Sequence, residues 1–93
     1  MIIGASTYDL HIQQAHSLKD KRSVLKSLMK RTKGRFNVSI AELDYHDTHQ
    51  RALIGVAVIS NSKKHAAEML DNVGRFIESG FEVEISLIST EIY

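Results

Sequence analysis

The chain has 93 residues, of which 43% are hydrophobic and 25% charged, with a formal net charge of +1 and no cysteine. This is the size and composition of one globular domain, so we expect a single domain over residues 1–93. The lack of cysteine excludes disulfide bonds and cysteine-ligated metal sites. The chain shows no signal-peptide pattern and no stretch of about 18 apolar residues, so we expect a cytoplasmic protein that does not enter a membrane.

The first half of the chain alternates between strand and helix patterns. Residues 2–12 are rich in β-forming side chains and predict a strand. Residues 17–34 have apolar side chains at helical spacing, and an S-x-x-D variant of the capping box begins at Ser17. Gly34 is expected to end this helix, and residues 36–43 alternate like a half-buried strand. The apolar side of the predicted helix consists of Leu18, Leu25, Leu28, Met29 and Thr32.

The second half repeats the same succession of patterns. Residues 52–60 are almost wholly apolar, which indicates a central strand covered on both faces. Residues 61–80 form a second amphipathic pattern, with Asn61 or Ser62 as the expected cap, and residues 81–93 alternate again as a strand. The order is therefore β–α–β–β–α–β.

This order predicts an α+β, ferredoxin-like βαββαβ sandwich, in which a four-stranded antiparallel sheet carries two helices on one face. We expect the first and third strands to be central and parallel to each other. The polar segment between the second and third strands then becomes a hairpin, with residues 44–50 at its tip.

The hairpin segment DYHDTHQR contains residue types that metal sites and hydrolases use. His46, Asp47 and His49 are close enough in sequence to hold a metal ion together, but no other ligand pattern supports them. No nucleophile elbow or phosphate-binding loop occurs either. The residue pattern therefore favours a polar turn, with no enzyme activity, metal or other cofactor, over a metal-dependent activity.

Charged residues flank this turn. We expect Glu42 and Arg51 to pair across the hairpin, which at an exposed position stabilises by a few tenths of a kcal/mol. The predicted charge cluster at the hairpin consists of Glu42, Asp44, Asp47 and Arg51.

The first helix carries most of the positive charge. Eight of the twelve basic residues and one acid lie between residues 17 and 35, whereas residues 68–93 contain six acids and one base. On a helical wheel five cations share an arc of about 80° beside the apolar side: Lys19, Arg22, Lys26, Lys30 and Lys33. Such a face suits a phosphate backbone, although solvated helices often carry one as well. Arg31 and Arg35 would extend the face.

The open face of the sheet offers an alternative surface. If Ile54, Val56 and Val58 face the helices, the outward face of the sheet is apolar. We therefore expect a homodimer or larger oligomer that forms through this face or along an edge strand. The last strand changes phase after Leu87, so Ile88 and Ile92 are expected on the opposite side, across a bulge. The outward residues of the third strand are Leu53, Gly55, Ala57 and Ile59.

Several stretches of the chain resemble the YlxP-like family of small bacterial proteins of unknown function, namely SLKDKRSVLKSL, RFNVSIAELDYHD, QRALIGVAVIS and FIES. The resemblance runs from about Ile2 to Glu78. The resemblance implies a ferredoxin-like fold. Genes of the family lie beside genes for transcription, translation and ribosome maturation, so the resemblance also implies association with RNA or the ribosome. The family motif falls on Ser17, Leu18, Lys19, Lys21, Arg22, Arg35, Phe36, Asn37, Val38, Ala41, Glu42, Asp44, Asp47, Gln50, Arg51 and Gly55.

From the residues and the resemblance together we expect a non-enzymatic, cytoplasmic factor that binds RNA or a ribosomal particle through the first helix. The alternative is a homodimer or larger oligomer that binds a protein or ligand through the open sheet face, and a metal-dependent activity at residues 44–51 ranks last. The predicted RNA-binding residues are Lys19, Lys21, Arg22, Lys26, Lys30, Lys33 and Arg35.

Overall fold

The computed structural model describes all residues, 1–93, and contains the predicted succession of elements. In chain order the elements are β1 (Ile2–His11), α1 (Leu18–Arg35), β2 (Ser39–Asp44), β3 (Arg51–Ser60), α2 (Lys63–Gly80) and β4 (Glu84–Ile92). The first helix begins one residue after Ser17. Strands β1, β2 and β4 are shorter than the sequence patterns suggest, whereas β3 begins one residue earlier, at Arg51.

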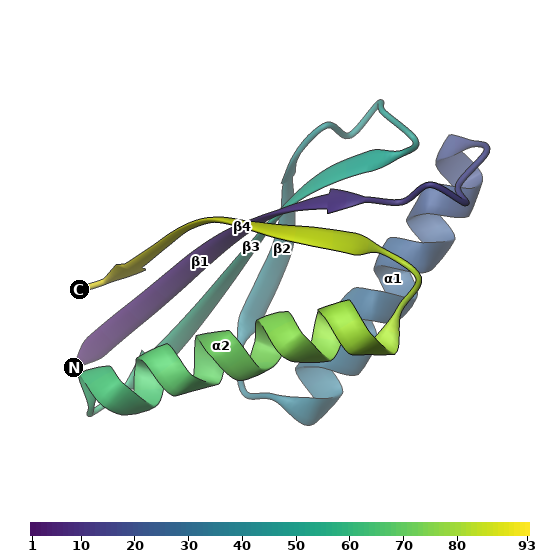
Figure 1. Cartoon of the computed structure of the whole chain (residues 1–93). Helices are drawn as coiled ribbons and strands as arrows, with labels where there is room; N and C mark the ends of the chain where they lie inside the picture. The colour runs from purple at the N-terminus through teal and green to yellow at the C-terminus, as the bar shows by residue number, and fades with distance from the viewer.

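The strands form one sheet in the order β2-β3-β1-β4, and both helices lie on the same side of it (Figure 1). All three neighbouring pairs are antiparallel, with Ser6 opposite Val56 in the central pair. The prediction that β1 and β3 are parallel was wrong. The α1 crossover returns the chain so that β2 runs parallel to β1, and the tight hairpin then reverses the direction of β3.

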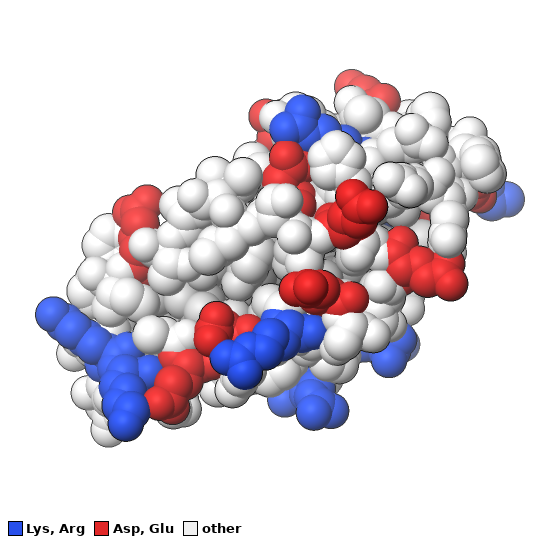
Figure 2. Space-filling view, in the orientation of Figure 1, with Lys and Arg blue, Asp and Glu red and all other residues white.

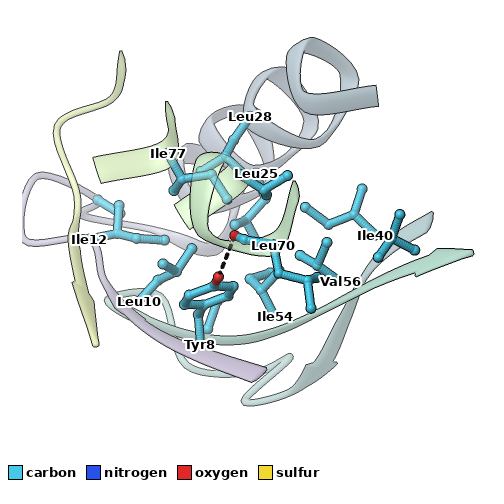
Figure 3. Close-up of a cluster of buried hydrophobic side chains, with 14 of the residues drawn as sticks. Tyr8, Leu10, Ile12, Leu25, Leu28, Ile40, Ile54, Val56, Leu70 and Ile77 are labelled. Carbon is cyan, nitrogen blue, oxygen red and sulfur yellow. Dashed lines mark hydrogen bonds between the residues drawn. The ribbon is translucent and has the colours of Figure 1, made fainter. Parts of the chain in front are cut away.

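The core lies between the sheet and the two helices. Helix α2 packs over β1, β3 and β4, while α1 packs beside it over the edge strand β2. Figure 3 shows this core, in which the Tyr8 hydroxyl donates a hydrogen bond of 3.0 Å to the carbonyl of Leu70 in α2. A buried hydroxyl without a partner would cost about 1–3 kcal/mol, so this bond lets Tyr8 occupy the core.

Both helices begin with the serine caps that the sequence indicated. Ser17 accepts a hydrogen bond from the backbone N–H of Asp20, and Ser62 accepts one from His65. The prediction that Gly34 ends the first helix was wrong, because α1 continues through Arg35 and no glycine has a positive φ. The helix instead ends as the backbone becomes extended at Phe36. Neither helix is long and apolar enough to cross a membrane.

The outer face of the sheet is apolar along β3, as predicted, since Ile54, Val56 and Val58 are buried beneath the helices. Gly55 allows Leu43 of β2 to lie flat on this outer face, because a Cβ at Gly55 would be 2.8 Å from the Leu43 Cδ1 atom.

A bulge interrupts β4 after Leu87, as the sequence suggested. Leu87 pairs with Tyr8 and Ser89 with Thr7, so Ile88 is the extra residue. The prediction that Ile92 faces outward was wrong. The extra residue restores the alternation, and the Ile92 side chain lies on the helix side, next to Gly4.

Candidate nucleic-acid interface

A groove of about 400 Å³ runs between α1 and the edge strand β2. Leu25 and Met29 of α1 supply its apolar part, and Glu42 of β2 is its one acidic residue. Four cationic side chains complete its lining: Arg22, Lys26, Lys30 and Lys33. None of the four forms a salt bridge within the protein, and all are exposed, so the groove presents unpaired positive charge to the solvent.

The groove follows directly from the spacing of residues along α1. Side chains three or four positions apart lie on one side of a helix, and the four cations follow that spacing from Arg22 to Lys33 over about 16 Å. The groove lining therefore confirms the helical-wheel prediction that these four cations lie on one side of α1. Lys19 lies one turn before Arg22, exposed and outside the groove lining.

Lys21 differs from the other lysines of α1, because it is buried with only 1% of its surface exposed. Its ammonium donates hydrogen bonds to the carbonyls of Tyr45, at 2.6 Å, and Thr48, at 2.7 Å. Its Nζ also lies 2.8 Å from Oε2 of Glu42, a buried oxygen with no other partner. Lys21 thus joins α1 to the hairpin and is not available to a phosphate, which corrects its place in the predicted RNA-binding set.

The sequence contained a signal for this burial. Lys21 lies four residues before Leu25 and seven before Leu28, on the apolar side of the helix and not on the cationic side. A lysine in that position is either an error in the pattern or a buried cation with dedicated acceptors. The three acceptors come from β2 and the hairpin, which are distant in sequence, so the pattern alone does not identify them.

The two predicted extensions of the basic face lie elsewhere on α1. The Arg35 guanidinium carbon is 5.3 Å from the ring centroid of Phe76, and that of Arg31 is 4.7 Å from Phe81. Both arginines therefore cover the aromatic cluster between α1 and α2 and do not line the groove.

The predicted ion pair between Glu42 and Arg51 does not form. Glu42 is opposite Ile54 and faces the helices, where it meets Lys21, whereas Arg51 is opposite His11 on the outer side. Strand alternation thus puts the two side chains on opposite faces of the sheet.

The remaining members of the hairpin charge cluster serve separate purposes. Asp44 accepts a hydrogen bond from the backbone N–H of Tyr45 at 2.7 Å, and Asp47 is exposed at the tip. The four residues predicted to form one cluster at the hairpin are therefore divided between the two faces and the tip.

Arg51 binds a residue that the sequence analysis missed. Its Nε and Nη2 atoms donate to the two carboxylate oxygens of Asp9, at 3.1 and 2.7 Å, which is a bidentate pair. These hydrogen bonds hold the pKa of Asp9 below its usual value of 3.8, although partial burial opposes the shift. On its other side the Arg51 guanidinium lies 4.2 Å from the ring centroid of Tyr45. Tyr45 is also the one non-glycine residue with a positive φ, 66°.

The hairpin histidines do not converge on a common point with other ligands. His46 and His49 are exposed, and the Nε2 atom of His46 is 3.9 Å from Glu42, which already binds Lys21. No three histidine, aspartate or glutamate side chains lie together in an arrangement that could hold a metal ion.

Acidic residues are most frequent in the second half of the chain, residues 51–93, which supplies only β3, α2 and β4. Figure 2 shows the protein in the orientation of Figure 1, with acidic side chains scattered over the whole visible face and basic side chains mostly along its lower border. The acids of this half of the chain are Glu68, Asp71, Glu78, Glu82, Glu84 and Glu91. Because α2 also carries Lys63, Lys64 and Arg75, this half of the chain has charges of both signs, with an excess of acids.

These features define a small ferredoxin-like α+β protein with a cationic groove beside one edge of its sheet. The chain belongs to the family described as "Protein of unknown function (DUF503)", which matches residues 3–90. It is 41% identical over 90 residues to "Uncharacterized protein YlxP" of Bacillus subtilis (strain 168), a match that covers 97% of this chain and 98% of the relative. The similarity therefore extends through most of β4, beyond the limit at Glu78 that the sequence resemblance suggested.

Two solved structures share the fold. A de novo designed protein with a ferredoxin fold matches 95% of this chain and 84% of its own, with a TM-score of 0.64 and 11% identity. A C-terminal segment of the alpha subunit of aIF2 from Pyrococcus abyssi has a TM-score of 0.55 and 15% identity over 96% of this chain. This chain spans 50% of that second structure. At such identities the likeness concerns the fold alone.

Proposed function

We propose that this protein is a non-enzymatic RNA-binding factor of the cytoplasm, and that the groove between α1 and β2 holds the phosphate backbone. The observation that carries the proposal is the set of four unpaired cations along one groove: Arg22, Lys26, Lys30 and Lys33. An RNA of the ribosomal particle is the partner that the family resemblance favours.

The dimensions of the groove fit a nucleic-acid strand. Its cations extend over about 16 Å, and phosphates along a helical strand follow one another about every 3.4 Å of axis, so the groove faces about four or five phosphates. Met29, which is partly exposed, adds apolar contact area for sugars, while the four cations neutralise phosphates and so release counterions from the RNA. Binding of this kind reads the backbone and the shape of the RNA more than its base sequence.

The negative charge of Glu42 does not prevent an anion from binding in the groove. Its carboxylate lies 2.8 Å from the buried ammonium of Lys21, so the two charges largely cancel at the floor. Lys21 therefore supports the groove indirectly, by neutralising the single acid in its lining.

The experiment that tests this proposal is a titration of fluorescent RNA followed by anisotropy at several salt concentrations. We expect binding that weakens with salt as about three or four phosphate contacts require, with a log–log slope of about −2 to −4. The variant Lys26→Glu/Lys30→Glu should lower affinity about 10- to 100-fold at low salt.

The matched control for this titration is Lys63→Glu/Lys64→Glu, which makes the same change of net charge at two exposed positions of α2. It should lower affinity far less than the groove variant. Equal losses in the two variants, or no binding by the unmodified protein, would refute the groove as the RNA site.

A second candidate function is self-association through the outer face of the sheet. Ile59 is 68% and Ile88 58% exposed, and Leu43 lies on Gly55 so that this face is flat. A second copy of the chain would cover this apolar surface. Sedimentation equilibrium tests this candidate: a dimer that dissociates on Ile59→Lys supports it, and a monomer at high concentration refutes it.

A further inference from the structure

The β2–β3 hairpin is held more firmly than a polar turn requires. Lys21 reaches it from α1 through the carbonyls of Tyr45 and Thr48, and Arg51 reaches it from the outer face through the ring of Tyr45. Figure 1 shows the hairpin at the end of the sheet opposite the chain termini, close to the start of α1. Both contacts converge on Tyr45, whose φ of 66° is unfavourable for an aromatic residue.

A residue kept in an unfavourable conformation by surrounding contacts often belongs to a functional surface. Here the contacts fix the direction of the Tyr45 ring and place a planar guanidinium against it at 4.2 Å. Asp9 fixes the guanidinium in turn by two parallel hydrogen bonds. The Arg51 side chain nevertheless stays 41% exposed, so the stacked pair is accessible from the solvent.

We propose that the Arg51–Tyr45 stack receives an unpaired nucleobase, so that the RNA held in the groove is single-stranded where it passes the hairpin. This inference rests on the proposed function and makes it more specific. Aromatic rings and arginine planes are the surfaces on which proteins stack unpaired bases. A continuous duplex cannot supply such a base, because the faces of its bases are already stacked on one another.

The groove and the stack adjoin each other through shared residues. Glu42 lines the groove and binds Lys21, and Lys21 donates to the backbone carbonyl of Tyr45. A strand whose phosphates lie along α1 thus reaches the hairpin at the end of the groove near Arg22. There it can pass around the edge strand β2 to the outer face.

The charges of the stack make the inference separable from the proposed function. Asp9 and Arg51 have opposite charges and cancel, so the stack contributes contact area and little net charge. Removing the ring should lower affinity for single-stranded RNA without changing its salt dependence, whereas removing groove lysines should change both.

The test compares a fluorescein-labelled single-stranded RNA with a blunt duplex of equal length. The variant is Tyr45→Asn, which removes the ring but suits the positive φ, since asparagine adopts this conformation more easily than tyrosine. Unmodified protein should bind the single strand more tightly than the duplex. Tyr45→Asn should lose about 5- to 10-fold on the single strand with an unchanged salt slope.

Two further variants complete the design. Tyr45→Phe keeps the aromatic face and should rescue single-strand binding, while Arg51→Lys keeps the charge but lacks the planar guanidinium and should resemble Tyr45→Asn. Circular dichroism of each variant verifies folding. Equal affinity for the two RNAs, or unchanged affinity in Tyr45→Asn, would overturn the stacking inference. If binding in that case still weakens with salt and with loss of the groove lysines, the proposed function stands. No binding of either RNA overturns both.

Discussion

At the scale of single residues, two buried or half-buried ion pairs determine the shape of the hairpin. Lys21 and Glu42 meet on the helix side of the sheet, and Asp9 and Arg51 meet on the outer side. Neither pair was predicted, since each joins residues 20 or more positions apart in sequence. Because both pairs stabilise the hairpin, we expect that removing either pair lowers the free energy of unfolding.

We predict that Lys21→Met destabilises the protein by about 2–4 kcal/mol. The substitution leaves two hairpin carbonyls and the Glu42 carboxylate without their buried cation, which costs more than the lost contact itself. Chemical denaturation followed by circular dichroism measures the change. Lys26→Met, the same substitution at an exposed position of the same helix, should change stability by less than about 0.5 kcal/mol. A similar decrease in the free energy of unfolding in both variants would mean that the contacts of Lys21 do not stabilise the hairpin.

The Asp9–Arg51 pair predicts a dependence of stability on pH. Hydrogen bonds from Arg51 lower the pKa of Asp9 below 3.8 in the folded state. Between the folded and unfolded pKa values the unfolded state therefore binds more protons, so this contribution is complete above about pH 5 and is lost as the pH falls through the folded pKa.

Denaturation midpoints at several pH values measure this contribution. At pH 7 the unmodified protein should be more stable than Asp9→Asn, and the gap should narrow steadily below about pH 4. A gap that stays constant down to pH 2 would contradict the assigned pKa direction.

At the scale of elements, α1 uses three sides for three purposes. Its apolar side packs on the sheet, its cationic side lines the groove, and Arg31 and Arg35 cover the aromatic rings between the helices. Helical periodicity identified the first two sides. It could not identify the third, because the Phe76 and Phe81 partners belong to α2 and the segment that follows it.

Two of the three helical glycines, Gly34 and Gly74, give opposite expectations for substitution by alanine. A Cβ at Gly34 of α1 would meet nothing within 4 Å, so Gly34→Ala should stabilise by about 0.5–1 kcal/mol through helix propensity. A Cβ at Gly74 of α2 would lie 3.0 Å from the Tyr8 hydroxyl and 3.3 Å from its ring. In Gly74→Ala the added methyl group should force α2 away from β1. The cost of this displacement should exceed the gain in helix propensity, so the variant should be less stable than the unmodified protein.

Thermal melting of the two glycine variants, side by side, measures these changes. The melting temperature should rise for Gly34→Ala and fall for Gly74→Ala. A rise in both would mean that α2 does not need its close approach to Tyr8.

At the scale of the whole molecule, the sequence predicted the succession of elements, the ferredoxin-like sandwich and the central place of β3. Alternation and helical spacing are local, and they were sufficient for this. The relative direction of β1 and β3, the end of α1 and the side of Ile92 were predicted wrongly. The antiparallel direction of β1 and β3 follows from the order of elements itself, whereas the side of Ile92 depends on the bulge in β4. For the groove, periodicity indicated its four cations and left Lys21 outside them. Lys21 was nevertheless included in the predicted RNA-binding set, since charge alone does not distinguish a buried lysine from an exposed one.

Four exposed cations without a salt-bridge partner line one groove of the molecule, between α1 and β2. The central claim is that RNA binds at this surface, in the groove between α1 and β2. Two-dimensional ¹⁵N–¹H NMR during an RNA titration tests it most directly. We predict that the amide signals which shift belong to α1 between Arg22 and Lys33 and to β2, with further shifts at Tyr45 and Arg51. Shifts confined to β4, α2 or the outer face of β3, or an unchanged spectrum at low salt, would contradict the claim.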